Sequence, residues 1–152
     1  MRISTKFPVA VHSMIMIAAL SDKEKVNSDK ISESTGVNAV IIRTIFKSLK
    51  QANLILVSPG PGGTTLARDP DDITLWDILT AVEKMETEDI FKFHKNVSEH
   101  CPVGSNIYGL LSTHLDDVID SSKSVLSNVT LAMLLNDLYS LMPDLLALPK
   151  QG

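Results

Sequence analysis

The sequence lacks most of the features that would indicate a disulfide-bonded protein, a metal site or an enzyme. One cysteine among 152 residues cannot form an internal disulfide, which fits a reducing, cytoplasmic environment. No set of nucleophile, base and orienting residue can be recognised, and no pair of catalytic carboxylates stands out. The glycine-rich stretch near residue 60 lacks the Lys-Ser or Lys-Thr ending of a phosphate-binding loop. We therefore expect no enzymatic activity and no bound cofactor.

No apolar run is long enough to cross a bilayer. Arg2 and Lys6 precede an apolar stretch that resembles a secretory signal, but His12 and Ser13 interrupt it. Pro8 is tolerated in the first turn of a helix. Apolar residues also recur there with the spacing of one helix face, namely Phe7, Val11, Met14, Ile15 and Ala18. The stretch predicts an amphipathic first helix with no membrane partner, and a signal peptide is the alternative.

The charges are distributed unevenly along a chain of ordinary globular composition, with 44% hydrophobic and 21% charged residues. Residues 1–68 hold nine Lys/Arg and four Asp/Glu, a net charge of +5. Residues 69–152 hold five Lys and fourteen Asp/Glu, a net charge of −9, so the whole chain carries −4. A basic N-terminal half joined to an acidic C-terminal half predicts a polyanion-binding face and a separate regulatory or assembly region.

The stretch from Asn27 to Ala52 predicts two helices joined by a tight turn. Asn27 can cap a short helix over 28–35, and Gly36 can end it in the left-handed conformation. Asn38 can then cap a second helix that runs to about Ala52. An apolar residue at 31, a small residue at 32, the glycine and further apolar residues follow in the order that a helix-turn-helix requires.

The second of these helices has two different faces. Its inward stripe is predicted to be Ile42, Ile45, Phe46 and Leu49. The outward side would then face a major groove if DNA is the partner, and it consists of Ala39, Val40, Arg43, Thr44 and Lys47. A surface helix with solvated charges is the alternative interpretation.

A hairpin is predicted directly after this helix. Residues 54–57 and 64–67 are strand-like, and the Pro-Gly-Pro-Gly-Gly run between them indicates a tight turn. A glycine tip allows backbone N–H groups to approach phosphates closely, although any tight hairpin has the same need for glycine. Together the elements predict a winged helix-turn-helix, in a fold that is mainly α with a small β-hairpin wing.

The remainder is predicted to be helical and to assemble the protein. Thr74 and Asp77 form a capping box for a helix that ends near residue 83. A long helix is expected from Pro102 to Ser127, and Thr130 can cap a last one. We expect a DNA-binding domain at 1–84, a loop at 85–101 and a helical dimerisation region at 102–152. The dimer contacts would come from a heptad-like seam that includes Tyr108, Leu111, Leu115, Val118 and Val125.

At several places the sequence resembles the Rrf2 family of bacterial winged-helix regulators. The matching stretches are Met1–Lys6, Gly60–Gly63, Leu66–Pro70, Ile73–Leu79 with Ala81–Glu83, and Cys101–Gly104. The last of these resembles the YwnA-like branch, which lacks the iron–sulfur cluster of other members. The resemblance covers nearly the whole chain, and the wing with its following helix is its most specific part.

The resemblance implies that DNA is contacted by the second helix and by the wing. Contacts are expected from Thr5, Lys6, Ser28, Asn38, Ala39, Val40, Arg43, Thr44, Lys47, Gly60, Gly62, Gly63 and Thr64. The family often has serine, tyrosine, glutamate and glutamine where this chain has Val40, Ile41, Arg43 and Thr44. The mode of DNA binding is therefore expected to carry over, but the operator sequence is not.

Cys101 is a candidate sensor residue. The family's cluster is held by three cysteines in this region, and this chain has only Cys101. Iron–sulfur clusters need several thiolates, so no cluster is expected. His94, His100, Cys101 and His114 do not match a usual zinc spacing. If Pro102 opens the long helix, the thiol would lie at a helix N-terminus, which lowers its pKa and makes it sensitive to oxidants. The alternative is an inert, half-buried cysteine.

The sequence thus predicts a cytoplasmic homodimeric repressor that binds a pseudo-palindromic double-stranded DNA operator, with an unknown effector. A thiol-based redox switch acting through Cys101 is one alternative. A winged-helix module that binds protein and not DNA is the other, because the chain carries a net charge of −4.

Overall fold

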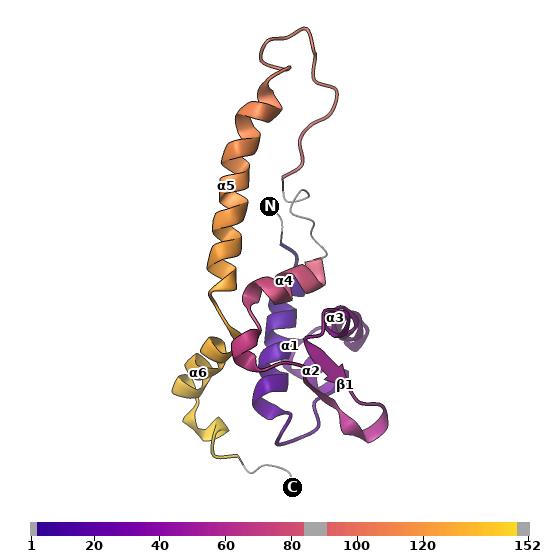
Figure 1. The fold of residues 1–152 in the computed structure, drawn as a ribbon. Helices are drawn as coiled ribbons and strands as arrows, with labels where there is room; N and C mark the ends of the chain where they lie inside the picture. Colours follow the sequence, from indigo (N-terminus) through magenta and orange to yellow (C-terminus); the bar gives the residue numbers. More distant parts are fainter. Residues whose placement is uncertain (1–2, 84–90, 149–152) are drawn as a thin grey trace.

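Helix α1 (Lys6–Leu20) lies at the centre of the fold, and the other N-terminal elements surround it (Figure 1). The computed structural model describes residues 3–83 and 91–148. In chain order the further α-helices and strands are α2 (Ser28–Thr35), α3 (Ala39–Gln51), β1 (Ile55–Val57), β2 (Thr64–Leu66), α4 (Leu75–Glu83), α5 (Ile107–Ser127) and α6 (Leu131–Leu141). The predicted fold class, mainly α with a two-stranded wing, is confirmed.

The predicted amphipathic character of α1 is wrong. Ala10, Met14 and Ile17 are fully buried, and Ser13 is buried with its hydroxyl donating to the Val9 carbonyl at 2.8 Å. The helix contacts α2, α4, α6 and β2. Because neighbours cover it from several sides, α1 has no single inward face, and its sequence shows only a weak helical period.

The helix-turn-helix forms as the sequence predicts. The Asn27 side chain accepts a hydrogen bond from the Lys30 backbone N–H at 2.9 Å, and Gly36 ends α2 at φ = 71°. Asn38 caps α3 by accepting from the Val40 N–H at 2.8 Å. Asn53, at φ = 57°, turns the chain out of α3 and toward the wing. These caps satisfy backbone donors that the helix itself leaves unpaired.

The wing is a short antiparallel hairpin in which Ile55 pairs with Leu66 and Val57 with Thr64. A 3₁₀ turn, η1 (Gly60–Gly62), forms its tip. The predicted capping box is also present: the Thr74 N–H donates to Asp77 Oδ2 at 2.9 Å, and the Asp77 N–H donates to Thr74 Oγ1 at 3.1 Å. Helix α4 follows, and its Ile78, Leu79 and Val82 are buried.

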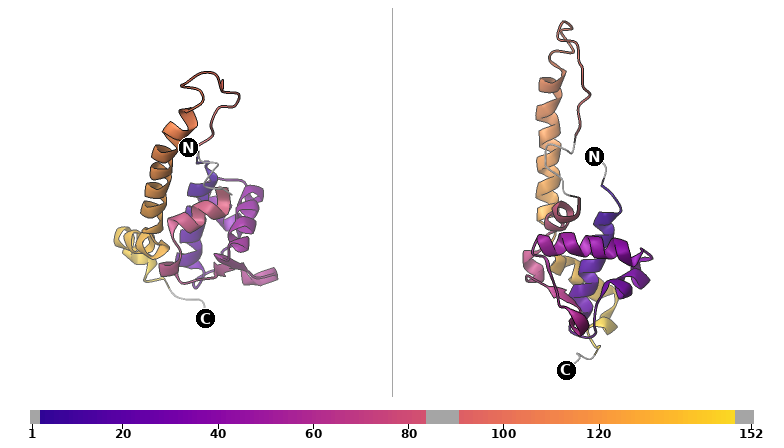
Figure 2. Two further views of the ribbon diagram at one scale, coloured as in Figure 1. Left: turned by 45° about the horizontal axis from the view of Figure 1, so that its top comes forward. Right: turned by 90° about the vertical axis from the view of Figure 1, so that its right-hand side faces the viewer.

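Helix α5 projects away from the winged domain, and both views in Figure 2 show this extension. It begins at Ile107 and not at Pro102 as predicted. The chain first closes into turns, in which the Ser105 N–H donates to the Cys101 carbonyl at 2.9 Å and the Asn106 N–H to the Val103 carbonyl at 3.1 Å. Residues 91–106 form no helix or strand, and the predicted loop's residues 85–90 lie outside the described residues.

Helix α6 packs back onto the winged domain, which corrects the predicted division at residue 102. Leu131 and Leu135 join the core beside α1. The Leu75 N–H donates to the Val129 carbonyl at 2.9 Å, and the Leu131 N–H donates to the Ile73 carbonyl at 2.8 Å. The predicted Thr130 cap is present, and its hydroxyl accepts from the Met133 N–H at 3.2 Å. Helix α5 contacts α4 and then extends away from the N-terminal unit together with the loop before it.

Candidate nucleic-acid interface

The outer face of α3 is exposed in the helix-turn-helix. The four apolar residues predicted to face inward are all buried, which fixes the orientation of the helix. Val40, Arg43, Thr44 and Lys47 are consequently exposed, while Ala39 is half-buried. Val40 is 62% and its neighbour Ile41 47% exposed, a high value for apolar side chains. This face can present both apolar and basic groups to a partner.

The polar side chains of α3 differ in the hydrogen bonds and ion pairs that they already make within the chain. The Asn38 carbonyl oxygen serves the helix cap, and the Thr44 hydroxyl donates to the Val40 carbonyl at 3.1 Å. Arg43 Nη2 lies 3.5 Å from Asp29 Oδ1 of α2. Both partners are well exposed, so this ion pair is weak and can be exchanged for a base or a phosphate. Arg43 and Lys47 are basic groups on this face, and Lys50 in the last turn of α3 is exposed as well.

The wing tip is held against the loop between α1 and α2. Lys25 Nζ donates to the Gly60 carbonyl at 3.2 Å, and the Thr64 N–H donates to the Val26 carbonyl at 2.9 Å. Gly60 and Gly63 have φ of 69° and 70°. A Cβ at position 63 would lie 3.0 Å from Lys25 Cγ and 3.3 Å from the Val26 backbone. Glycine is therefore needed where the two segments meet.

Two wing residues that were expected to contact DNA face inward. The Thr64 side chain is only 3% exposed, and Gly63 is buried against the α1–α2 loop. Gly60 and Gly62 remain exposed at the tip. Lys25, which was not among the predicted DNA contacts, lies beside this tip. Its positive charge in the basic half was the one available signal.

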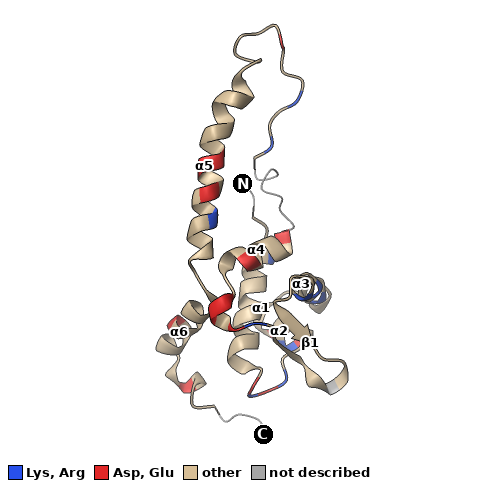
Figure 3. Cartoon of the chain, viewed as in Figure 1, with Lys and Arg blue, Asp and Glu red and all other residues tan. Residues whose placement is uncertain are grey.

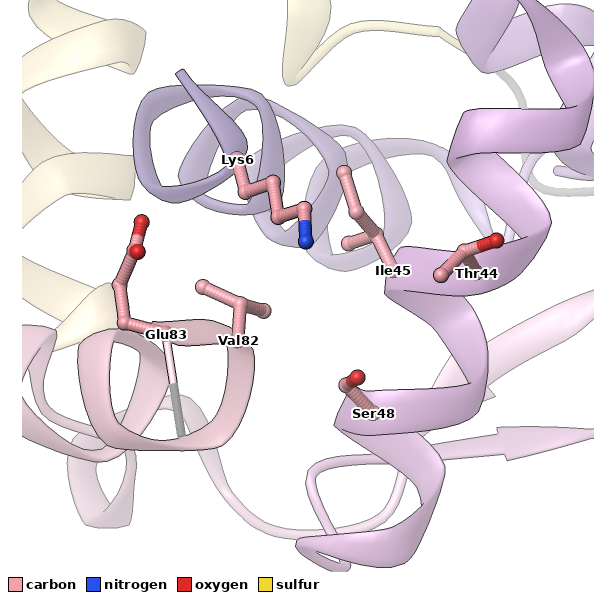
Figure 4. Close-up of a pocket in the computed structure, with 6 residues that line it drawn as sticks. All are labelled: Lys6, Thr44, Ile45, Ser48, Val82 and Glu83. Atoms are coloured by element: carbon pink, nitrogen blue, oxygen red, sulfur yellow. The ribbon is translucent and has the colours of Figure 1, made fainter. Parts of the chain in front are cut away.

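The start of α1 lies next to α3. Lys6 extends toward α3 in Figure 4, where a cavity of about 160 Å³ is also lined by Thr44, Ser48 and Glu83. Glu83 Oε1 accepts hydrogen bonds from the Ser4 backbone N–H at 3.1 Å and from the Ser4 hydroxyl at 2.6 Å. These bonds fix the turn before Thr5 and Lys6, both of which are exposed. A single phosphate could be reached from both α1 and α3. Ser28, at the first turn of α2, is half-buried.

The uneven charge of the sequence is visible in space. Figure 3 shows Lys and Arg on α3 and around α2 and the wing, and clusters of Asp and Glu on α5 and before α4. Arg68 belongs to the basic half but serves the fold, since its Nε donates to the Asn53 carbonyl at 3.1 Å and its Nη2 to the Ala52 carbonyl at 3.3 Å. The outer basic surface is thus formed mainly by lysines and Arg43.

Residues 3–137 match the Rrf2 family, described as an iron-dependent transcriptional regulator. The chain belongs to the Rrf2 family. It is 31% identical over 137 residues to YwnA of Bacillus subtilis (strain 168), covering 90% of this chain and 99% of YwnA. It is 30% identical over 138 residues to the HTH-type transcriptional regulator IscR of Vibrio atlanticus (strain LGP32), covering 90% of this chain and 76% of IscR.

Solved structures agree with this assignment. The structure of T. potens IscR matches with a TM-score of 0.68 and 25% identity, covering 100% of this chain and 94% of that one. The protein is therefore a transcriptional regulator by family, and no enzymatic family is indicated. Among the described residues, no helix is both long and apolar enough to cross a membrane.

The Rrf2 family is described as iron-dependent, so we asked whether the residues of this chain could hold an iron–sulfur cluster. One cysteine cannot supply the several thiolates that hold an iron–sulfur cluster. No three His, Cys, Asp or Glu side chains gather into a metal site within residues 3–83 and 91–148. His94 instead lies beside the Tyr108 ring, with 5.9 Å between the ring centroids. The donor set does not fit a cluster of this kind.

Cys101 is exposed, contrary to the half-buried alternative, and it lies six residues before α5. The predicted position of the thiol at a helix N-terminus is therefore wrong. Its pKa is nevertheless lowered, because the backbone N–H groups of Gly104 and Val103 hydrogen-bond to the sulfur. Such bonds stabilise the thiolate, which is the reactive form.

The seam predicted on α5 is largely exposed in the single chain. Leu111, Val118 and Val125, spaced by seven residues, are 41%, 47% and 64% exposed, and Leu115 is half-buried. Tyr108 differs from these, because it contacts the preceding loop of its own chain. Its ring meets that of Phe93 at 4.9 Å between centroids, and its hydroxyl donates to the His94 carbonyl. Leu110, 61% exposed, was not among the predicted seam residues.

Proposed function

We propose that the protein is a homodimeric repressor that binds a pseudo-palindromic DNA operator through α3 and the wing. The observation that carries this proposal is the outer face of α3, which presents Arg43 and Lys47 beside exposed Val40. Arginine can bond both acceptors of a guanine edge, and an apolar side chain can contact a thymine methyl group. Lys6, Lys25 and Lys47 would contact phosphates and fix the position of α3 on the duplex.

The stripe on α5 supports a dimer. Leu111, Val118 and Val125 recur every seven residues, which is the spacing of a two-helix seam. A helix of 21 residues is about 32 Å long, so two such helices can pack over several turns. A two-fold dimer would place its two α3 helices in major grooves about 34–36 Å apart on one side of the DNA.

Selection of bound fragments from random double-stranded DNA with the purified full chain tests the proposal. We expect a two-fold symmetric sequence and, on the recovered operator, a strong dependence of affinity on salt. Arg43→Ala should weaken operator binding by about 1–3 kcal/mol and relax the base preference at one position of each half-site. Lys47→Ala should weaken binding to all sequences alike and reduce the salt dependence.

Lys95→Ala is the matched control, because Lys95 is exposed in the loop before α5, outside the proposed interface. Recovery of no sequence above background would favour the protein-binding alternative. A reporter gene placed behind the recovered operator tests repression, because a repressor lowers its expression and deletion of the regulator restores it.

A second candidate function is a redox switch at Cys101, favoured by its exposure and its lowered pKa. Hydrogen peroxide would oxidise the thiolate to a sulfenic acid and change operator binding. Titration of wild type and Cys101→Ser with peroxide in a DNA mobility-shift assay tests this idea. An identical response of the two proteins would show that the thiol is not the sensor.

A further inference from the structure

A second cavity, remote from α3, opens between α1, α6 and the end of α2. Its volume is about 520 Å³, and eight of its ten lining residues are apolar. Val11 and Ile15 of α1, Leu138 of α6 and Leu145 of the 3₁₀ turn after it are among them. Pockets of roughly 300–1,000 Å³ with mainly apolar walls are typical binding sites for small molecules.

The polar groups in this cavity are two side chains that already contact each other. His12 Nε2 of α1 lies 2.8 Å from Ser34 Oγ of α2. Among the residues that the structure describes, no Lys, Arg, Asp or Glu lines the cavity. A sugar or a nucleotide would leave most of its polar groups without partners there, which is unfavourable in an apolar site. A molecule with one hydrogen-bonding group would be satisfied by the His12–Ser34 pair.

We propose that this cavity binds a small, mostly apolar organic molecule with a single hydroxyl group, and that it is the effector site of the regulator. Ser34 lies in the last turn of α2, two residues before Gly36, which forms the turn of the helix-turn-helix. A molecule that bonds to Ser34 and packs against α1 therefore acts on the position of α2 relative to the central helix. The effector role rests on the proposed DNA-binding function, whereas the binding site itself does not.

The C-terminal wall of the cavity is suited to admitting a ligand. Leu141 and Leu146 on either side of the turn that carries Leu145 are 79% and 63% exposed. Segments with few buried apolar contacts open at low cost in free energy. Residues 142–148 can therefore move aside and close over a ligand without disturbing the core formed by Leu131 and Leu135.

The binding site is tested by methyl NMR of the full chain with 3-phenylpropan-1-ol and n-propylbenzene as probes. The two probes share an apolar body, and only the first carries a hydroxyl. We expect the alcohol to shift the methyl signals of Val11, Ile15, Leu138 and Leu145, with a Kd of about 0.1–1 mM. The absence of shifts at these methyl groups at 5 mM alcohol would overturn the proposal.

Variants locate the site and its polar group. Val11→Phe fills part of the cavity and should weaken alcohol binding about tenfold, while Val103→Phe, a 65% exposed position in the loop before α5, should leave it unchanged. Ser34→Ala should weaken alcohol binding about 3–10-fold and change propylbenzene binding by less than twofold. Equal alcohol affinity in wild type, Val11→Phe and Ser34→Ala would place the ligand elsewhere and overturn the proposal.

The effector role has its own measurement. Saturating 3-phenylpropan-1-ol should change operator affinity at least about fivefold in wild type and not in Val11→Phe. An unchanged operator affinity in wild type would overturn the effector role. Failure to recover any operator would overturn the proposed function instead, and the NMR titration would still decide whether the cavity binds the alcohol.

Discussion

Helices α3 and α5 differ in how far their apolar side chains are buried by their own chain. In α3 the inward residues Ile42, Ile45, Phe46 and Leu49 are all buried by the same chain. In α5, Ile119 is the one buried residue among 21, and an apolar stripe faces solvent. The fold of one chain therefore buries the inward apolar stripe of α3 but leaves the apolar stripe of α5 exposed. Helix α3 is positioned to present a surface, whereas α5 contacts α4 and leaves an apolar stripe exposed.

The largest expected effect is on association through α5. Val118→Glu would bury an unpaired charge in the proposed seam, which costs about 3–5 kcal/mol. We expect the variant to be monomeric at micromolar concentration by sedimentation velocity, with an unchanged circular dichroism spectrum. Val103→Glu, at an exposed loop position, is the control and should remain dimeric. An equally dimeric Val118→Glu protein would remove α5 from the interface.

Truncation of one leucine in α3 and one in α5 separates burial within one chain from burial in the proposed dimer. Leu49→Ala should lower the free energy of unfolding by about 2–5 kcal/mol, because Leu49 is fully buried within one chain. Leu111→Ala should have a cost that depends on protein concentration, because its burial would come from the second subunit. Urea denaturation at several concentrations provides both values. A concentration-independent cost at Leu111 would contradict the proposed dimer.

Replacing one glycine in the wing and one in α5 by alanine should change stability in opposite directions. Gly63→Ala should destabilise the protein by about 1–3 kcal/mol, because φ is 70° there and a Cβ would press on Lys25 and Val26. Gly109→Ala should stabilise α5 by up to about 1 kcal/mol, because nothing lies within 4 Å of the added Cβ in a helix. Thermal unfolding measures both changes. Shifts of the same sign would refute this contrast.

Two asparagines that precede helices α2 and α5 should differ in how much they contribute to stability. Asn27→Ala should cost about 1 kcal/mol, because its side chain caps α2 through the Lys30 N–H. Asn106 occupies the corresponding position before α5 but makes no capping bond. Its amide instead donates to the Pro102 carbonyl at 2.7 Å in an exposed turn, so Asn106→Ala should cost less than about 0.5 kcal/mol in urea denaturation. Equal costs would show that the cap on α2 adds nothing.

The smallest effect concerns Cys101 in the turns before α5. The lowered pKa of its thiol increases the thiolate fraction near neutral pH, so the folded protein should react faster there with iodoacetamide. The midpoint of the rate against pH should be lower for the folded chain than for the same chain in urea. Coincident midpoints would show that the Gly104 and Val103 N–H groups do not stabilise the thiolate.

Features set by neighbours in the sequence could be predicted from it. The caps at Asn27 and Asn38, the turn at Gly36 and the Thr74–Asp77 box each depend on residues two or three apart. The four buried positions of α3 follow from the helical period alone. The wing followed from five turn residues between two short strand-like segments. The resemblance to the Rrf2 family was confirmed by the match over residues 3–137.

Features that depend on distant contacts could not be derived from the sequence. Thr64 faces inward because its segment bonds to Val26, and Tyr108 contacts the loop of its own chain. Cys101 lies in turns and not at the start of α5, because hydrogen bonds from Ser105 and Asn106 close the chain first. Lys25 lies beside the wing only because the hairpin folds back onto the α1–α2 loop.

The sequence by itself thus determined the helix-turn-helix, the wing and the heptad stripe, because caps, turns and periodicity act over a few residues. Only the tertiary structure decided that α1 is central, that α6 joins the winged domain and that a cavity lies between them. It did so because burial depends on which distant surfaces meet. The exposed stripe on α5 depends on both, since its seven-residue period is present in the sequence and its exposure arises because no element within residues 3–83 and 91–148 covers it.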